Sequence, residues 1–342
     1  MLKIKAVLQS FVTRRSCCHV SANVGRVRRQ QMIKEVNEEC QKIVQDGHYL
    51  LYHRGKPFLT GKKLDNTPKL VTFQDALNLV PDLQQEAVFL KLMSDDTPLF
   101  AAMLPKESST EDIEAQLGGK FTDMRAALFL VRSQWQGLMS GGSSLLRWLK
   151  AAKFCWSCKA PLERNASGCQ LKCTNPECKA VFYPPTSPVG ISLIAFQDHS
   201  KALLIRQSMY PQGMYSCCAG FVDPGESLSD CVVRESAEEA GVDVDPATLE
   251  MVDSNHWPNP AGSLMCGCIV TTETTSPSPC SHEIEAVKWF SPEELHKAVQ
   301  VVDKAPNLRF ANKDPNLLFV PPKGAIANVI IRTWLSKYHG LQ

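Results

Sequence analysis

The segment at residues 220–242, GFVDPGESLSDCVVRESAEEAGV, constrains the fold of this 342-residue chain more than any other. Ser227 is a suitable N-cap for a helix, and Asp230, three residues later, can complete a capping box. Gly241 is suited to end the helix, because glycine readily adopts the left-handed conformation of a C-terminal cap. The segment therefore predicts a helix over about residues 227–240.

Three glutamates of this predicted helix share one face. Glu235, Glu238 and Glu239 are related as i, i+3 and i+4, which brings their carboxylates close together. Each close pair of like charges costs roughly a few tenths of a kcal/mol, and a divalent cation removes that cost. Mg2+ takes oxygen ligands and keeps water and substrate phosphates in its shell. A solvated acidic helix face is the alternative, but the spacing favours a metal site.

The whole segment resembles the Nudix box, G-x5-E-x7-R-E-U-x-E-E-x-G-U, where U is aliphatic. Ser236 departs from the pattern, at the first aliphatic position. The resemblance implies an α+β protein with the Nudix fold, a mixed β-sheet sandwiched by helices. It also implies phosphoanhydride hydrolysis with two or three catalytic Mg2+ or Mn2+ ions. The matching residues are Gly220, Glu226, Arg234, Glu235, Glu238, Glu239, Gly241 and Val242.

The resemblance also implies roles for individual residues. Glu239 is the first choice for the base that activates water, although this role varies among Nudix enzymes. Arg234 is expected to pair with Glu226 and to hold the preceding loop against the helix. Glu238 is expected as a metal ligand or a supporting group. The implied Mg2+ or Mn2+ ligands are Glu235, Glu238, Glu239, the distal Glu283 and the carbonyl of Ala219.

A second module, at residues 151–185, contains two cysteine pairs. Cys155-x2-Cys158 is followed, after fourteen residues, by Cys173-x4-Cys178, a spacing typical of a zinc ribbon. Four thiolates complete a tetrahedral shell, so this site predicts one structural Zn2+ rather than a catalytic ion. Cys169 is an alternative to Cys173 as a ligand. Buried reduced cysteines, disulfides and a nucleic-acid-binding ribbon are the other interpretations.

Downstream of the box, residues 254–265 resemble the S-Q-P-W-P-F-P-x-S array of NADH diphosphatases. Trp257 beside Pro258 would form a rigid aromatic shelf for a base or a nicotinamide ring. A tryptophan buried in a proline-rich turn is the alternative. The expected substrate contacts of the array are Asn255, His256, Trp257, Pro258, Asn259, Pro260 and Ser263.

Three further positions match NADH diphosphatases. Tyr183 and Phe221 occupy the places of the adenine-stacking aromatic residues, and Ala327 corresponds to a late substrate contact. The likeness covers roughly residues 150–340 and is closest to the animal mitochondrial members of the family. It implies a homodimer, because the adenine pocket of such enzymes draws on both subunits.

The implied reaction is hydrolysis of NADH, and also of NAD+ or NADPH, to AMP or 2′,5′-ADP plus nicotinamide mononucleotide. Asn259 replaces the phenylalanine of the array, so dinucleotide hydrolysis is better supported than a preference for the reduced nicotinamide. The alternatives are another nucleoside diphosphate such as ADP-ribose, removal of the NAD cap from RNA, and a non-catalytic nucleotide-binding protein. Nucleic acid would be a partner only in cap removal, and the net charge of +2 implies no general attraction to it.

The first 34 residues are basic and contain no acidic side chain, and apolar and hydroxylated residues lie between the basic ones. This composition predicts a mitochondrial transit peptide; a disordered basic arm or a surface helix is the alternative. The longest apolar runs, such as residues 189–196, fall far short of the roughly 20 residues that cross a bilayer. No membrane association is expected.

The remaining segments complete the predicted organisation. Residues 35–150 correspond by position to the small α/β N-terminal domain of NADH diphosphatases, and residues 186–342 to the Nudix domain. Within the first of these, residues 49–53 and 56–59 predict a hairpin around Arg54 and Gly55. The sequence SGGSS at residues 140–144 predicts a flexible connection between two helices.

Overall fold

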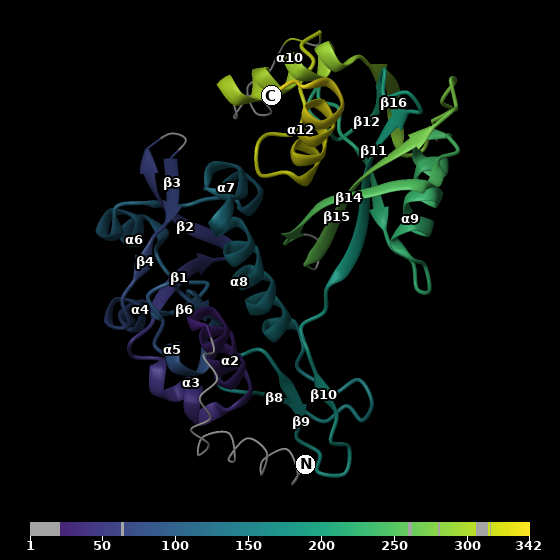
Figure 1. Cartoon of the computed structure of the whole chain (residues 1–342). Helices are drawn as coiled ribbons and strands as arrows, with labels where there is room; N and C mark the ends of the chain where they lie inside the picture. Colours follow the sequence, from purple (N-terminus) through teal and green to yellow (C-terminus); the bar gives the residue numbers. More distant parts are fainter. Residues whose placement is uncertain (1–20, 63–64, 259–261, 280, 306–313, 315) are drawn as a thin grey trace.

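The computed structural model describes residues 21–62, 65–258, 262–279, 281–305, 314 and 316–342. Their strands form three sheets, which lie within the ranges predicted for the N-terminal domain, the ribbon and the Nudix domain. Figure 1 shows the N-terminal body, the ribbon beside it and the C-terminal body beyond them. The sheets contain both parallel and antiparallel pairs and are flanked by helices, which confirms the α+β class.

The N-terminal sheet is built around the predicted hairpin. Strands β1 (His48–His53) and β2 (Lys56–Lys62) pair antiparallel, with His53 opposite Lys56. Arg54 (φ 49°) and Gly55 (φ 80°) both have positive φ, as a two-residue type I′ turn requires. The hairpin prediction is therefore confirmed. The other strands are β3 (Asp65–Pro68), β4 (Leu70–Val71), β5 (Val88–Leu92), β6 (Pro98–Met103), which is parallel to β1, and β7 (Lys120–Phe121).

Seven helices among the described residues surround this sheet. They are α2 (Ala22–Glu35), α3 (Asn37–Ile43), α4 (Phe73–Leu79), α5 (Leu83–Glu86), α6 (Thr110–Leu117), α7 (Met124–Leu130) and α8 (Ser133–Ala151).

Residues 140–144 form the middle of helix α8, so the prediction of a flexible connection there is wrong. Gly142 faces the sheet so closely that a Cβ would lie 2.9 Å from the Tyr52 hydroxyl and 3.0 Å from the Ala101 Cβ. The small residues therefore allow a close helix–sheet contact. Packing offsets the low helix propensity of glycine, which costs roughly 1 kcal/mol per residue.

Part of the predicted leader, helix α2, packs against the N-terminal domain. Ile33 is buried in its core, and the main-chain N–H of Leu92 donates to Gln30 Oε1 at 2.7 Å. Residues 1–20 lie outside the described part of the chain, and both the transit peptide and its boundary at residue 34 stay predictions. Removal of residues 22–34 would nevertheless expose part of this core.

The ribbon contains three short antiparallel strands, β8 (Leu162–Arg164), β9 (Leu171–Cys173) and β10 (Val181–Phe182). Its loop at residues 165–169 is joined to the N-terminal domain: Asn165 Nδ2 donates to the Lys34 carbonyl at 2.6 Å, and the Phe89 N–H donates to the Ser167 carbonyl at 2.9 Å.

The C-terminal sheet has the order β14-β15-β11-β12-β16, with β13 paired to β11. Strands β11 and β15 run parallel, from Ser187 opposite Ser263 to Phe196 opposite Thr272, and the other pairs are antiparallel. The strands are β11 (Ser187–Phe196), β12 (Ala202–Gln207), β13 (Cys218–Phe221), β14 (Asp245–Trp257), β15 (Ser263–Thr272) and β16 (Ile284–Phe290).

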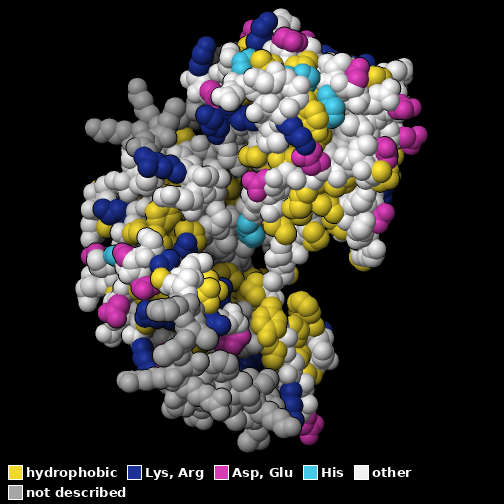
Figure 2. All heavy atoms as spheres, in the orientation of Figure 1, with side chains coloured by type: hydrophobic (Ala, Val, Ile, Leu, Met, Phe, Trp, Pro, Cys, Tyr) yellow, Lys and Arg dark blue, Asp and Glu magenta, His cyan; other side chains and the backbone are white. Residues whose placement is uncertain are grey.

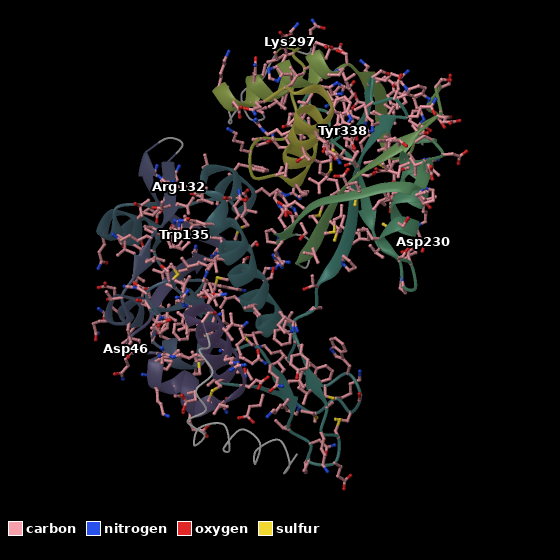
Figure 3. The ribbon with its side chains drawn as sticks, viewed as in Figure 1. Asp46, Arg132, Trp135, Asp230, Lys297 and Tyr338 are labelled. Carbon is pink, nitrogen blue, oxygen red and sulfur yellow. The ribbon has the colours of Figure 1, made fainter. Side chains whose placement is uncertain are left out.

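Helices cover both faces of this sheet, as the Nudix fold requires. Leu193 and neighbours on one face pack with α10 (Pro292–Lys304) and α12 (Ile326–His339). Ile194, on the other face, packs with Val232 of α9 (Leu228–Glu235). Asp230 of α9 and Tyr338 of α12, both labelled in Figure 3, lie on these opposite sides.

Of the helices in the described ranges, none combines the length and the apolar character needed to cross a bilayer.

Candidate active site

The predicted catalytic helix begins as its sequence indicates. The Asp230 N–H donates to Ser227 Oγ at 3.2 Å, and the Ser227 N–H donates to Asp230 Oδ2 at 3.0 Å, which completes the capping box. Gly241, at φ 63°, forms the C-terminal cap. The last turn, Ser236–Ala240, is a π-helix rather than the α-helix that we expected. Such turns are frequent at functional sites because they redirect side chains.

Ser236 is fully buried at the start of the π-turn, and its hydroxyl has no hydrogen-bond partner among the described residues. We expect Ser236→Ala to raise the free energy of unfolding by about 1 kcal/mol, because it removes a buried, unsatisfied polar group. Ser227→Ala is the matched control and is expected to lower it by about 1 kcal/mol, because it removes the helix cap. Chemical denaturation measures both. A loss of stability in Ser236→Ala would show that the hydroxyl is satisfied, for example by water.

The three glutamates of the helix differ in their surroundings. Glu239 points inward and is 3% exposed: its Oε2 accepts from the Ala219 N–H at 2.9 Å and from the Cys218 thiol at 2.8 Å. Burial raises the pKa of Glu239, although these two donors oppose the shift. The Glu235 side chain is 14% exposed, and the Glu238 side chain is 59% exposed. Glu239 and Glu235 are therefore largely buried, whereas Glu238 is exposed to solvent.

Arg234 joins the loop to the helix, as expected. Its Nε donates to Glu226 Oε1 at 2.6 Å and its Nη2 to Oε2 at 2.9 Å, while Nη2 also donates to the Phe221 carbonyl at 2.8 Å. The hydrogen bonds that Arg234 and the Asp223 N–H donate to Glu226 lower the pKa of its carboxyl to about 2. Nη1 reaches Glu235 at 2.7 Å and Glu238 at 2.9 Å. One guanidinium thus offsets part of the repulsion among the carboxylates.

A cavity of about 480 Å³ opens beside these groups. It brings together six residues predicted for the site: Ala219, Phe221, Arg234, Glu235, Glu239 and Glu283. The other lining residues are Gln207, Ser208, Met209, Gly220 and Asp223. The sequence carried no signal for Gln207, which ends β12, or for Ser208 and Met209, which follow it, because only the sheet topology brings this strand end beside β13.

Gly220 leaves room for the Glu235 carboxylate at this cavity. A Cβ there would lie 1.7 Å from Glu235 Oε1, so no other residue fits without moving the carboxylate.

The oxygen donors of the cavity fit a hard divalent cation. Burial raises the pKa of Glu235, and the charges of Glu238 and Glu283 raise it further, so these carboxylates repel one another. Among the described residues only the four ribbon cysteines bring three or more ligand atoms within 4.8 Å of one another. The carboxylates are therefore too widely spaced for one closed shell. Such spacing suits ions that share their shells with water and phosphate oxygens.

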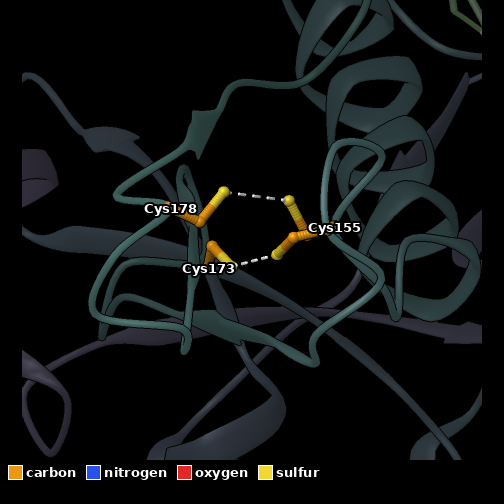
Figure 4. Close-up of side chains that lie close together, drawn as sticks. Cys155, Cys173 and Cys178 are labelled. Carbon is orange, nitrogen blue, oxygen red and sulfur yellow. Dashed lines mark hydrogen bonds between the residues drawn. The ribbon is translucent and has the colours of Figure 1, made fainter.

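The four predicted ribbon cysteines converge (Figure 4). The sulfurs of Cys155 and Cys178 are 3.7 Å apart, and those of Cys158 and Cys173 are 3.4 Å apart. Disulfides would require about 2.05 Å, whereas sulfurs around one tetrahedral zinc lie about 3.8 Å apart. Cys169 is directed away, with its thiol 3.7 Å from the Phe89 carbonyl. The geometry fits a thiolate metal site that excludes Cys169.

The tryptophan array lies elsewhere, at the end of β14 against the N-terminal domain, and does not line the acidic cavity. Trp257 packs on Phe129 with ring centroids 5.9 Å apart, and Asn255 Nδ2 donates to the Gly324 carbonyl at 3.3 Å. Ser263 is buried opposite Trp257. Trp257 remains partly exposed, so an aromatic shelf is still available. Asn259 and Pro260 lie outside the described residues.

The remaining predicted contacts are dispersed. Phe221 is 46% exposed at the cavity, where a ring can stack on it. Tyr183 is 67% exposed on the ribbon, accepts a hydrogen bond from Gln170, and does not line the cavity. Ala327 is buried in the core between α12 and the sheet, so its side chain does not reach the cavity either. The substrate contacts of all three stay predictions.

Comparison with known proteins agrees with the predicted Nudix domain in the C-terminal part of the chain. The NUDIX domain family matches residues 186–309. The mitochondrial NAD(P)H pyrophosphatase NUDT13 of Homo sapiens is 34% identical over 338 residues, which cover 93% of this chain and 92% of that protein. NUDT13 of Mus musculus is 33% identical and covers 92% of each chain. The NAD-capped RNA hydrolase ndx-9 of Caenorhabditis elegans is 33% identical over 70% of this chain and 64% of its own length.

Proposed function

This chain belongs to the Nudix hydrolase family, together with the mitochondrial NAD(P)H pyrophosphatases, and from that premise we propose the reaction that it catalyses. The chain is a pyrophosphohydrolase that cleaves NADH, and also NADPH or NAD+, at the central phosphoanhydride. Water adds to one phosphorus and the bridging bond breaks, giving AMP (2′,5′-ADP from NADPH) and the nicotinamide mononucleotide. The observation that carries the proposal is the cavity lined by Glu235, Glu239, Glu283 and Ala219.

The residues of this cavity would have different roles in the reaction. Bound Mg2+ or Mn2+ would neutralise the diphosphate and the leaving oxygen; Glu235, Glu239, Glu283 and the Ala219 carbonyl would hold the ions, with Glu238 at the margin. Glu239, whose pKa is raised by burial, is our first choice to accept the proton of the attacking water. Arg234 holds the loop that precedes the helix in place through its hydrogen bonds to Glu226 and to the Phe221 carbonyl.

We assign one structural Zn2+ to Cys155, Cys158, Cys173 and Cys178, because four sulfurs leave no open coordination position for chemistry. We also place the protein in mitochondria. Both NUDT13 relatives carry that location in their names, and the first 34 residues contain no acidic side chain.

A homodimer is part of the proposal. Figure 2 shows hydrophobic side chains gathered on the ribbon, and Phe154, Trp156, Val181 and Tyr183 are 40–67% exposed there. Exposed aromatic residues in such a patch are typical of an interface. A second subunit that covers the patch would also recruit Tyr183 to a substrate pocket.

The test is product analysis with the full chain, NADH and Mg2+ or Mn2+. We expect AMP and reduced nicotinamide mononucleotide in equal amounts. If folded, zinc-loaded protein releases neither with either metal, the NADH assignment is wrong and another nucleoside diphosphate, such as ADP-ribose, becomes the substrate to test.

Removal of the NAD cap from RNA is the second candidate, and one feature favours it. A cavity of about 800 Å³ between the N-terminal domain and the ribbon is lined by more basic than acidic side chains, which suits a polyanion. The basic ones are Lys106, Arg147, Lys150, Lys153 and Arg164, and the acidic ones are Asp82 and Glu86. If capped RNA is the substrate, its KM should rise steeply with salt while that of NADH changes little.

A further inference from the structure

We propose that helix α8 of the N-terminal domain positions the tryptophan array for the nucleotide, with Ser140 as the principal positioning residue. The inference rests on the proposed function, because it assumes that the array contacts the substrate. It assigns a role in the reaction to a domain that carries none of the acidic cavity.

Ser140 makes a double contact with His256. Its Oγ lies 2.8 Å from the ring Nδ1 and 3.2 Å from the main-chain carbonyl of His256, and Ser140 is fully buried. A hydroxyl has one proton, so both contacts with His256 are hydrogen bonds when the ring donates from Nδ1 and Ser140 donates to the His256 carbonyl rather than to the Gly137 carbonyl, which lies 3.3 Å from Oγ. Burial lowers the pKa of His256, which favours the neutral ring that this arrangement uses. Ser140 therefore fixes both the ring and the main chain of this position.

The next two residues are also held by the N-terminal domain. Trp257 packs against Phe129, which lies in α7, and against the hydrophobic core beneath α8. Arg147 Nη1, two turns after Ser140, donates to the Pro258 carbonyl at 3.0 Å. Three consecutive residues of the array thus take their conformation from α7 and α8.

Small residues allow this close approach. A Cβ on Gly262, where φ is 89°, would lie 3.0 Å from Ser144 Oγ and 3.4 Å from His256 Nε2. The chain that returns from the array therefore passes directly over α8. Residues 140–144 serve two contacts at once, since Gly142 faces the N-terminal sheet while Ser140 and Ser144 face the array.

Positioning of this kind has a defined kinetic signature. The acidic cavity shares no residue with the contact between α8 and the array. Loss of the Ser140 contact should therefore weaken nucleotide binding, which raises KM, without changing the groups that act on the phosphates.

The experiment compares Ser140→Ala with Ser143→Ala, which makes the same chemical change at a buried serine one position from Gly142. We expect Ser140→Ala to raise the KM for NADH about tenfold, with kcat and Mn2+ affinity within about twofold of wild type. Ser143→Ala should leave KM within about twofold. Nitrogen NMR of His256 should show the Nδ1-protonated ring in wild type and a shift towards the Nε2-protonated ring in Ser140→Ala.

An unchanged KM in Ser140→Ala, with normal hydrolysis by wild type, would overturn the inference alone. Equal losses in both serine variants would also overturn it, because they would indicate a general effect on packing. Absence of NADH hydrolysis by the wild-type chain would instead overturn the proposed function.

Discussion

Replacing Glu239 with glutamine is expected to lower kcat for NADH by about 10³-fold, within the range that loss of a general base produces. The neutral amide cannot accept a proton from water and is a poor ligand for a divalent cation. Glutamine has nearly the same shape, and its Oε1 can still accept from the Ala219 N–H, so the fold should persist. Release of AMP with saturating Mg2+ measures the effect.

Glu238→Gln is the matched control, because it makes the same change one residue earlier on an exposed side chain. We expect its kcat to fall by less than about tenfold, since Arg234 keeps three other carboxylate contacts, with Glu226, Glu235 and Asp223. If Glu238→Gln were as impaired as Glu239→Gln, the proton acceptor would have to be reassigned.

Replacing Cys173 with serine is expected to reduce bound zinc from about one ion per chain to nearly none. Zinc binding and folding of such small modules are coupled, so the ribbon should unfold and the apparent Tm should fall by roughly 10 °C. Metal analysis and thermal unfolding measure the two effects, and hydrogen exchange of residues 155–182 would locate them.

The control for this prediction is Cys169→Ser, in the ribbon loop that precedes β9 and outside the cysteine cluster. It should retain zinc and lose little stability. Zinc loss in Cys169→Ser, with retention in Cys173→Ser, would exchange the roles of the two cysteines.

Local signals predicted the parts of the molecule that local interactions determine. The capping box of Ser227, the turn at Arg54 and Gly55 and the bidentate pairing of Arg234 with Glu226 each involve residues close in sequence. The burial of the Glu239 side chain was not predictable, because it depends on the π-helical turn and on hydrogen-bond donors from β13.

Long-range packing explains what the sequence could not reveal. Glycine-rich residues 140–144 are helical because a sheet and a second domain close on them from different sides. The position of Trp257 against Phe129 joins residues 128 positions apart, and no pattern near either residue indicates that contact.

The parallel pairing of β11 with β15 affects the order in which parts of the chain can fold during synthesis on the ribosome. The strands of the N-terminal sheet and the ribbon all precede residue 183, so both can fold while the rest of the chain is still being made. The central strand β11 can pair early with β12 and β13, but its other edge must wait for β15, because Ser187 pairs with Ser263. In newly made chains one edge of this apolar strand therefore stays unpaired until β15 is made, whereas α8, against which the array packs, has already been made.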